Sequence, residues 1–133
     1  MYLLDTNIIS ELRRPRPHAA AVAWLSGIAP EQVFLSAVTL GELQAGVENT
    51  RQQDAGRAEI IESWIDIVAA SYNVLPMDGR AFRCWAQLMH GKPADLIADA
   101  MIAATAVVHN LTVMRRNLRD FERLGVPALN PFR

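Results

Sequence analysis

The amino-acid sequence predicts one three-layer α/β domain over residues 1–133, with a mostly parallel central sheet flanked by helices. Short apolar runs of strand length alternate with longer stretches of helical periodicity, which is the pattern of parallel strands joined by crossover helices. The length of 133 residues fits one domain, and a hydrophobic content of 51% is ordinary for a compact core and too high for a disordered chain. No internal repeat or low-complexity linker divides the chain.

The expected strands are short apolar runs bounded by polar or turn-forming residues, a pattern typical of buried strands. The opening run Tyr2-Leu3-Leu4 is the first of them, and Val33-Phe34-Leu35 is the second. In chain order, we expect strands at 2–4, 33–35, 74–75, 111–114 and 126–129.

The expected helices begin and end at residues with capping or helix-breaking chemistry. Pro15 and Pro17 break the first helical stretch, and Pro17 can open the next, because proline fits the first position of a helix. Asp78 is placed to cap a helix, Pro93 to open one and Asn110 to end it in the left-handed conformation. In chain order, we expect helices ending near 12 and spanning about 17–25, 39–47, 53–69, 78–88, 93–108 and 117–124, the last ended by Gly125.

The composition limits the classes of function. A formal net charge of −1 gives no global positive field of the kind many nucleic-acid binders show. Arginines gather locally near 13–16 and 115–123, where they form either solvated helix faces or a track for a nucleic-acid backbone. The single cysteine, Cys84, suits a reducing compartment. With no basic leader and no apolar stretch of membrane-spanning length, we expect a cytoplasmic protein.

Asp5 follows the first strand directly, which places its carboxylate at the carboxyl end of a central strand. Ligands of open α/β sheets bind at that edge. A buried charge there costs several kcal/mol unless it is paired. No Lys or Arg occurs before Arg13, so the partner must come from far along the chain or be a bound cation, and the further carboxylates below favour the cation.

Asp99 is, like Asp5, a charge in an apolar setting. The helical stretch from Leu96 to Val108 is apolar on every side apart from Asp99 and Thr105. A helix that is hydrophobic all round is normally buried. Asp95, one turn earlier, would repel a second ionised carboxylate. The alternative is that Asp99 interacts with the helix N-terminus, a contribution of about 0.3–1 kcal/mol that fades after the first turn.

Two further polar positions have both a capping and a functional interpretation. Thr39-Leu40-Gly41-Glu42 matches a capping box, but Glu42 also follows the second strand closely enough to share an edge with Asp5. Asn117 and Asp120 can cap the helix after the strand at 111–114, and Asn117 can also add a polar oxygen to the acidic group.

Three or four oxygen ligands at one sheet edge are what Mg²⁺ or Mn²⁺ prefers. The three histidines are isolated, so there is no cluster with zinc-site spacing, and there is no glycine-rich phosphate loop. An acidic metal site without a phosphate cradle points to hydrolysis of a phosphodiester by metal-activated water.

Four segments in this order resemble the PIN-domain nucleases, in particular the VapC/FitB-like toxins of bacterial type II toxin–antitoxin pairs. They cover nearly the whole chain: 2–11 (YLLDTNIISE), 35–43 (LSAVTLGEL), 99–106 (DAMIAATA), and 116–121 (RNLRDF) continuing through 129–132 (LNPF). The resemblance implies a PIN-like fold and an endoribonuclease that depends on Mg²⁺ or Mn²⁺, with three carboxylates as the metal ligands: Asp5, Glu42 and Asp99.

The resemblance also adds Asn117 to the catalytic set, in a fourth position that is often acidic. An amide there removes one charge, and Asp120 is an alternative fourth acid. Where Arg115 stands, the family usually carries a small hydroxyl residue, so this arginine could contact phosphate or crowd the site.

The partners implied by the resemblance are an RNA substrate, a second copy of the chain, and a cognate antitoxin that blocks the site and alone contacts operator DNA. The arginines expected to follow the RNA backbone are Arg13, Arg14, Arg115 and Arg116.

Two other functions are weighed against the nuclease. Aspartyl-phosphate phosphatases also carry an aspartate after the first strand, but they need a second one where Asn7 stands and a nearby lysine, whereas Lys92 is the only lysine. A catalytically weak PIN-like module that binds protein or RNA is the other alternative, and Asn117 and Arg115 are the residues that favour it.

Overall fold

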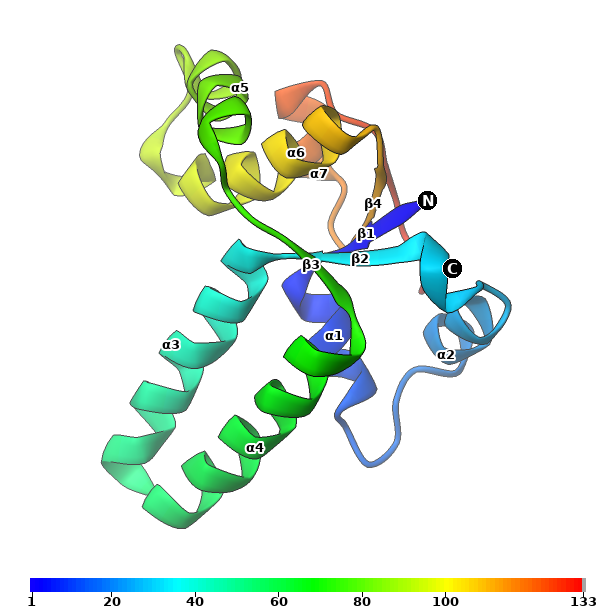
Figure 1. Cartoon of the computed structure of the whole chain (residues 1–133), viewed down its shortest axis with the longest axis vertical. Coiled ribbons are helices and arrows are strands. Elements are labelled where there is room, and N and C mark those ends of the chain that lie inside the picture. The colour runs from blue at the N-terminus through cyan, green and yellow to red at the C-terminus, as the bar shows by residue number, and fades with distance from the viewer. Residues whose placement is uncertain (133) are drawn as a thin grey trace.

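The computed structural model describes residues 1–132 as a sheet between helices (Figure 1). The strands are β1 (Tyr2–Leu4), β2 (Val33–Ser36), β3 (Asn73–Leu75), β4 (Thr112–Met114) and β5 (Ala128–Leu129). The α-helices are α1 (Thr6–Leu12), α2 (Ala19–Ser26), α3 (Ala37–Gln53), α4 (Ala55–Ser71), α5 (Gly79–Met89), α6 (Ile97–His109) and α7 (Arg119–Leu124). Two 3-10 turns are η1 (Pro30–Gln32) and η2 (Ala94–Leu96).

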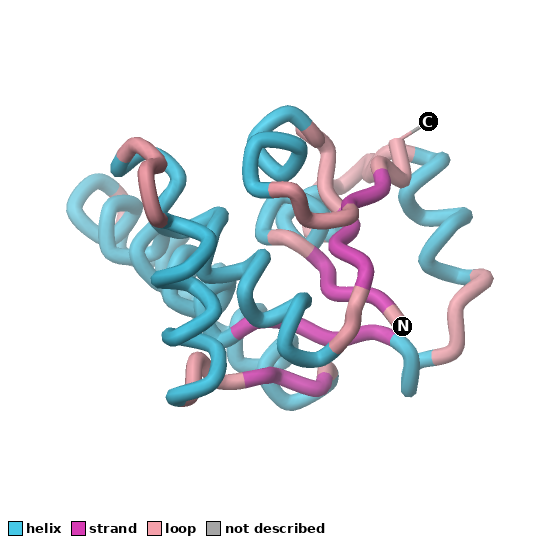
Figure 2. Tube along the Cα trace, turned by 90° about the horizontal axis from the view of Figure 1, so that it is seen from above, coloured by secondary structure: helices cyan, strands magenta, loops and turns pink. Residues whose placement is uncertain are grey.

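All neighbouring strands of the sheet are parallel, in the order β3-β2-β1-β4-β5. This confirms the α/β fold with a parallel central sheet, and Figure 2 shows the strands running between helices. In β1, Leu4 lies opposite Leu35 of β2 and Met114 of β4. The residues that follow these three strands therefore meet at one edge of the sheet.

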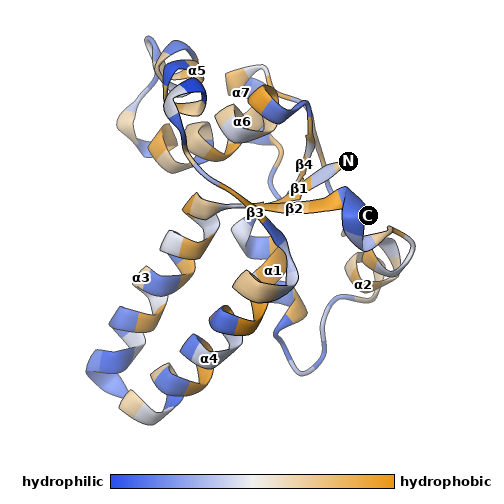
Figure 3. Cartoon of the chain, in the orientation of Figure 1, coloured by the Kyte–Doolittle hydropathy of each residue, from blue (hydrophilic) through white to orange (hydrophobic). Residues whose placement is uncertain are grey.

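The core has two sides because successive side chains of a strand point to opposite faces. Leu3 packs into the apolar cluster beneath α5, α6 and α7, whereas Leu4 packs into the cluster beneath α1, α2 and α4. Both leucines are fully buried. Figure 3 shows hydrophobic residues along the sheet and more hydrophilic ones toward the outer ends of α3 and α4.

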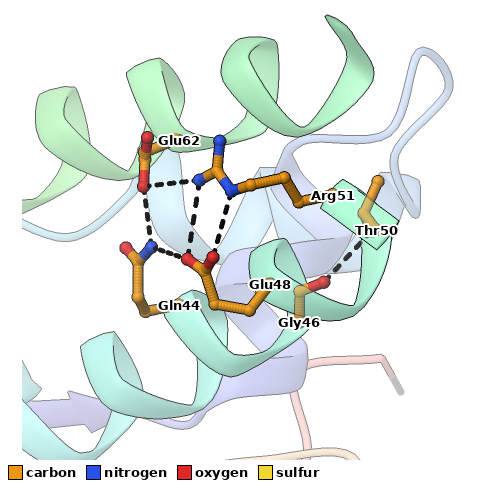
Figure 4. A network of polar contacts seen from close by, with 6 residues as sticks. All are labelled: Gln44, Gly46, Glu48, Thr50, Arg51 and Glu62. Carbon is orange, nitrogen blue, oxygen red and sulfur yellow. Dashed lines mark hydrogen bonds and ion pairs between the residues drawn. The ribbon is translucent and has the colours of Figure 1, made fainter. Parts of the chain in front are cut away.

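Helices α3 and α4 form a hairpin that is joined by side-chain contacts near its outer end (Figure 4). Gln44 Nε2 donates to Glu48 and Glu62, each at 2.7 Å, and Arg51 donates to the same two carboxylates, each at 3.0 Å. The hydrogen bond from Arg51 lowers the pKa of Glu48, and those from Gln44 and Arg51 lower the pKa of Glu62. Asp54 then caps α4 by accepting from the Arg57 amide at 3.0 Å.

The start of α3 differs from the prediction. The helix begins at Ala37, capped by Ser36, whose Oγ accepts from the Val38 amide at 3.1 Å. Thr39 is therefore inside the first turn, and the capping box proposed for Glu42 is wrong. The break expected after Val47 is also absent, because α3 continues to Gln53.

The start of α6 differs as well. Pro93 precedes the 3-10 turn η2, and the α-helix begins only at Ile97, so Asp99 lies in its first turn. The other end is as predicted, since Asn110 is left-handed with φ 55°. Pro17 likewise lies before α2, which His18 caps. Gly125 ends α7 with φ 70°, and Asp78 caps α5, both as predicted.

Within residues 1–132, no helix combines the length and the apolar character needed to cross a membrane.

We predict that Ser36→Ala lowers the free energy of unfolding by about 1 kcal/mol, because it removes the side-chain acceptor at the N-terminus of α3. Urea unfolding followed by circular dichroism measures this change. The control is Ser71→Ala, since the Ser71 hydroxyl is exposed and donates only to the Ile67 carbonyl within α4. Its effect should stay within about 0.5 kcal/mol. Equal effects of the two substitutions would contradict the assignment of the cap.

Candidate functional site

Three carboxylates predicted to act together lie around one cavity of about 380 Å³ at the carboxyl edge of the sheet. Asp5 comes from the end of β1, Glu42 from α3 and Asp99 from α6. Arg115, at the end of β4, lines the same cavity. Because Leu4 is in register with Met114, Asp5 and Arg115 occupy equivalent places after two adjacent strands.

Asp5 is held in place by the backbone on both sides. Its own amide donates to the Met114 carbonyl at 3.0 Å, which extends the pairing of β1 with β4 by one residue. Its Oδ1 accepts from the Thr6 amide at 2.8 Å and so caps α1. Only 5% of the residue is exposed. The second oxygen, Oδ2, faces Arg115 at 3.6 Å.

Glu42 is oriented by Thr6 rather than by its own helix terminus. The Thr6 hydroxyl donates to Glu42 Oε1 at 2.7 Å and lies 3.3 Å from the Thr39 hydroxyl. Glu42 projects from the second turn of α3, which begins directly after β2, the neighbour of β1. The functional interpretation of Glu42 therefore agrees with its position, at the same edge as Asp5.

Arg115 lies between Asp5 and Asp99. Its Nη1 is 3.2 Å from Asp99 Oδ1 and 3.6 Å from Asp5 Oδ2. The guanidinium stacks on the Phe121 ring at 4.5 Å from the ring centroid, and only 5% of Arg115 is exposed. Of the two partners that the sequence allowed for Asp5, a distant residue or a bound cation, the cation was favoured, and that preference is wrong here because the distant Arg115 is the partner.

The electrostatics of Asp5 reflect this crowding. Burial raises the pKa of its carboxyl above the ordinary value of 3.8. Arg115 and the hydrogen bond from Thr6 oppose that rise, while the negative charges of Asp99 and Glu42 add to it. The pKa stays raised with Arg115 in place because burial outweighs the attraction of its guanidinium and the hydrogen bond from Thr6.

The donor set matches a hard divalent cation, because carboxylate oxygens from three elements face one open cavity. Two of these carboxylates already share one positively charged nitrogen, that of Arg115. In the arrangement described for residues 1–132, no three Asp, Glu, His or Cys side chains are grouped closely enough to hold a metal. Carboxylate oxygens are suitable ligands for Mg²⁺ or Mn²⁺. In this structure Arg115 lies between two of these carboxylates, those of Asp5 and Asp99.

Asn117 and Asp120, the alternative fourth acid, lie away from this cavity. Asn117 Oδ1 accepts from the Arg119 amide at 3.0 Å near the start of α7, and the residue lines a neighbouring cavity with Arg116 and Arg119. Asp120 pairs with Arg123 at 3.5 Å. The N-cap of α7 is Leu118 and not Asn117 as predicted, although the Asn117 side chain bonds to the first residue of the helix, and Asp120 lies in the first turn as predicted. Neither Asn117 nor Asp120 is among the residues lining the acidic cavity.

The arginines predicted to contact RNA divide into three settings. Arg14 and Arg116 line the acidic cavity, where the Arg116 guanidinium stacks on Phe132 at 4.1 Å. Arg13 stacks on Trp64 at 5.7 Å and lines a separate cavity that also reaches Glu42. Arg115 is turned inward to the carboxylates.

The sequence interpretation missed a polar stripe on α1 that lines the acidic cavity. Glu11 is only 6% exposed and pairs with Arg14 at 3.5 Å. The signal was available, because helical neighbours lie three or four residues apart. The stripe consists of Thr6, Asn7, Ser10 and Glu11, and it continues past the end of α1 to Arg14, which was already predicted to contact RNA.

Comparison with known proteins shows to which family the chain is similar. The PIN-domain profile matches residues 2–127. The chain is 38% identical over 140 residues to the toxin FitB of Neisseria gonorrhoeae, with 99% of each chain covered. It is 37% identical over 140 residues to the VapC ribonuclease Y4jK of Sinorhizobium fredii, covering 99% of this chain and 98% of that one. The crystal structure of FitAcB from N. gonorrhoeae superposes with a TM-score of 0.86 at 36% identity, covering 99% of both chains.

We predict that Asp5→Asn stabilises the metal-free protein at neutral pH. A carboxyl whose pKa is raised by folding loses stability as the pH rises above 3.8, because the unfolded chain ionises first. Asparagine keeps a cap acceptor for the Thr6 amide and removes the charge. Urea unfolding in the presence of EDTA should show that the advantage of Asp5→Asn grows from pH 3.5 to pH 7.

The control is Asp66→Asn, which changes an exposed aspartate on α4. Its effect on stability should differ little between the two pH values. A loss of stability in Asp5→Asn that deepens with rising pH would mean that the ion pair with Arg115 outweighs burial.

Proposed function

The chain belongs to the PIN-domain family, and from that premise we propose that it is a metal-dependent endoribonuclease acting as the toxin of a toxin–antitoxin pair. The observation that carries the proposal is the convergence of Asp5, Glu42 and Asp99 on one cavity from three separate elements. The names of the two relatives, a toxin and a ribonuclease, support the same activity.

Asp5, Glu42 and Asp99 would hold Mg²⁺ or Mn²⁺, which when bound lowers the pKa of water and offsets negative charge on the phosphodiester. The chain itself supplies the positioning. The cap on α1 fixes the Asp5 carboxylate, and the Thr6 hydroxyl fixes that of Glu42. Because both oxygens are held before substrate arrives, little reorganisation is needed on binding.

Arg14 and Arg116 are the arginines placed to bind the RNA backbone, since both line the cavity that holds the carboxylates. Phosphate contacts of this kind position a strand without reading its sequence. Arg13 borders the adjoining cavity and extends the same track past Glu42. Arg115 can join them only if it leaves Asp5 and Asp99.

The proposed partners follow from the toxin role. A cognate antitoxin would cover the site, and operator DNA would be contacted through that antitoxin alone. We further propose that the protein is cytoplasmic and forms a homodimer. Asn117 stays a proposed member of the catalytic set, acting from the neighbouring cavity beside Arg116.

The second candidate function is a catalytically weak PIN-like module that binds protein or RNA. Two observations favour it: Arg115 already pairs with two of the carboxylates, and Asn117 is not among the residues lining their cavity. A titration of the purified protein with Mn²⁺ separates the candidates. Tight antitoxin binding without measurable metal binding would identify the module.

We predict that Asp99→Asn and Glu42→Gln each lower Mg²⁺-dependent RNA cleavage by about 100-fold or more. Loss of a group that only supports a metal ligand costs about 10- to 100-fold, so loss of a ligand carboxylate should exceed that. Cleavage of a labelled single-stranded RNA and growth arrest on expression are the measurements. Asp66→Asn, an exposed change of the same kind on α4, should keep full activity.

Full cleavage by either site variant would remove that residue from the site. Loss of cleavage in Asp66→Asn would indicate damage unrelated to the cavity.

We predict that Arg14→Ala weakens RNA binding and reduces the slope of log affinity against log salt concentration by about 0.7, as expected for one lost phosphate contact on single-stranded nucleic acid. Binding is measured in the presence of Ca²⁺ or with Asp99→Asn, so that cleavage does not interfere. Arg57→Ala changes an exposed arginine on α4 and should leave the slope unaltered. An unaltered slope in Arg14→Ala would exclude that contact.

A further inference from the structure

We propose that Arg115 is an internal counter-ion that competes with the divalent metal, so that a metal binds Asp5 and Asp99 only when the guanidinium withdraws. The inference rests on the proposed function, because it takes the acidic cavity to be a metal site. Beyond that function, Arg115 controls how tightly the cavity binds a metal.

The geometry puts the two cations in the same place. Nη1 of Arg115 lies 3.2 Å from one oxygen of Asp99 and 3.6 Å from one oxygen of Asp5. A Mg²⁺ ion bridging the two carboxylates would need oxygen contacts of about 2.0–2.1 Å, and its remaining positions would be filled by water. A nitrogen between the same oxygens leaves no room for that coordination shell, and two positive charges so close would repel each other.

The attachment of Arg115 explains why it reaches this position. Its amide donates to the Leu129 carbonyl at 2.9 Å, which fixes the backbone between β1 and β5 at the end of β4. The Phe121 ring supports one face of the guanidinium. The buried Nε has no hydrogen-bond partner, so among the described residues the polar contacts of the guanidinium are directed at the two carboxylates.

That unpaired Nε also makes the inward position easier to leave. A buried donor without a partner is unfavourable, so the pairing with Asp5 and Asp99 has to outweigh it. A divalent cation offers those carboxylates twice the charge of the guanidinium. Arg115 lines a cavity of about 380 Å³, which leaves space for an outward rotamer.

Competition of this kind has a defined thermodynamic form. The apparent metal affinity equals the intrinsic affinity multiplied by the fraction of molecules in which Arg115 has withdrawn. If position 115 carries a side chain too short to reach the carboxylates, metal binding no longer depends on this fraction, and the apparent affinity equals the intrinsic one. The family resemblance places a small hydroxyl residue at this position, so threonine is the natural replacement.

The test is the affinity of the purified full-length protein for Mn²⁺, measured by isothermal titration calorimetry without RNA. A guanidinium beside a carboxylate typically changes its affinity for a proton by about 10- to 1,000-fold. We therefore expect Arg115→Thr to bind Mn²⁺ about tenfold more tightly or better. Arg115→Lys keeps the charge and should stay closer to the wild type.

The matched control is Arg123→Thr, which removes one exposed arginine from α7, where it pairs with Asp120 outside the cavity. It should leave Mn²⁺ affinity unchanged. Equal affinities in wild type and Arg115→Thr would overturn the competition while leaving the metal site intact. An equal gain in Arg123→Thr would overturn it too, by tracing the effect to net charge. Absence of binding in all of these proteins would overturn the metal site and the proposed function together.

A measurement on the wild type covers the case in which Arg115→Thr does not fold. The side-chain Nε–H signal of Arg115, assigned by its loss in Arg115→Lys, should be protected from water in EDTA because the group is buried. Saturating Mg²⁺ should shift this signal and speed its exchange with water. A signal that stays unchanged while Mg²⁺ binds would contradict the withdrawal of Arg115.

Discussion

The contact of Arg115 with Asp5 and Asp99 is the interaction on which the candidate site depends. One guanidinium joins the ends of β1 and β4 to the first turn of α6. Without a cation between them, two carboxylates would face each other in a largely buried place, which is strongly unfavourable. The fold therefore requires a positive charge at this point, and Arg115 supplies it in this structure.

The parallel sheet creates that requirement. Strand order places β1 between β2 and β4, so residues that follow these strands meet at one edge. The same register that buries Leu3 and Leu4 on opposite faces delivers Asp5 to the centre of this edge. Helices α3 and α6 bring Glu42 and Asp99 to it, and α1 adds a polar stripe. The parallel sheet therefore both buries the core leucines and gathers the charged side chains at one edge.

Much of this arrangement could be predicted from the sequence. Short apolar runs followed by Asp5 or Glu42 placed two carboxylates at one edge of the sheet. The apolar helix singled out Asp99, and the family resemblance joined it to the other two. The contact of Arg115 with Asp5 was not predictable in the same way, because it depends on β1 and β4 being neighbours in register although they are far apart in the chain. For Glu42 the sequence was misleading in the other direction, because a local capping motif matched but does not form. Ser36, and not Thr39, caps α3, and Glu42 accepts a hydrogen bond from Thr6 instead.

We propose that Arg115 and a divalent metal share the acidic cavity as a cation site. The most direct test is a crystal structure of the wild-type protein soaked in Mn²⁺, with anomalous scattering used to locate the ion. We expect an anomalous peak in direct contact with oxygens of Asp5 and Asp99, with Arg115 turned out of the cavity. Arg115 still between the two carboxylates at saturating Mn²⁺, with no anomalous peak beside them, would contradict the account.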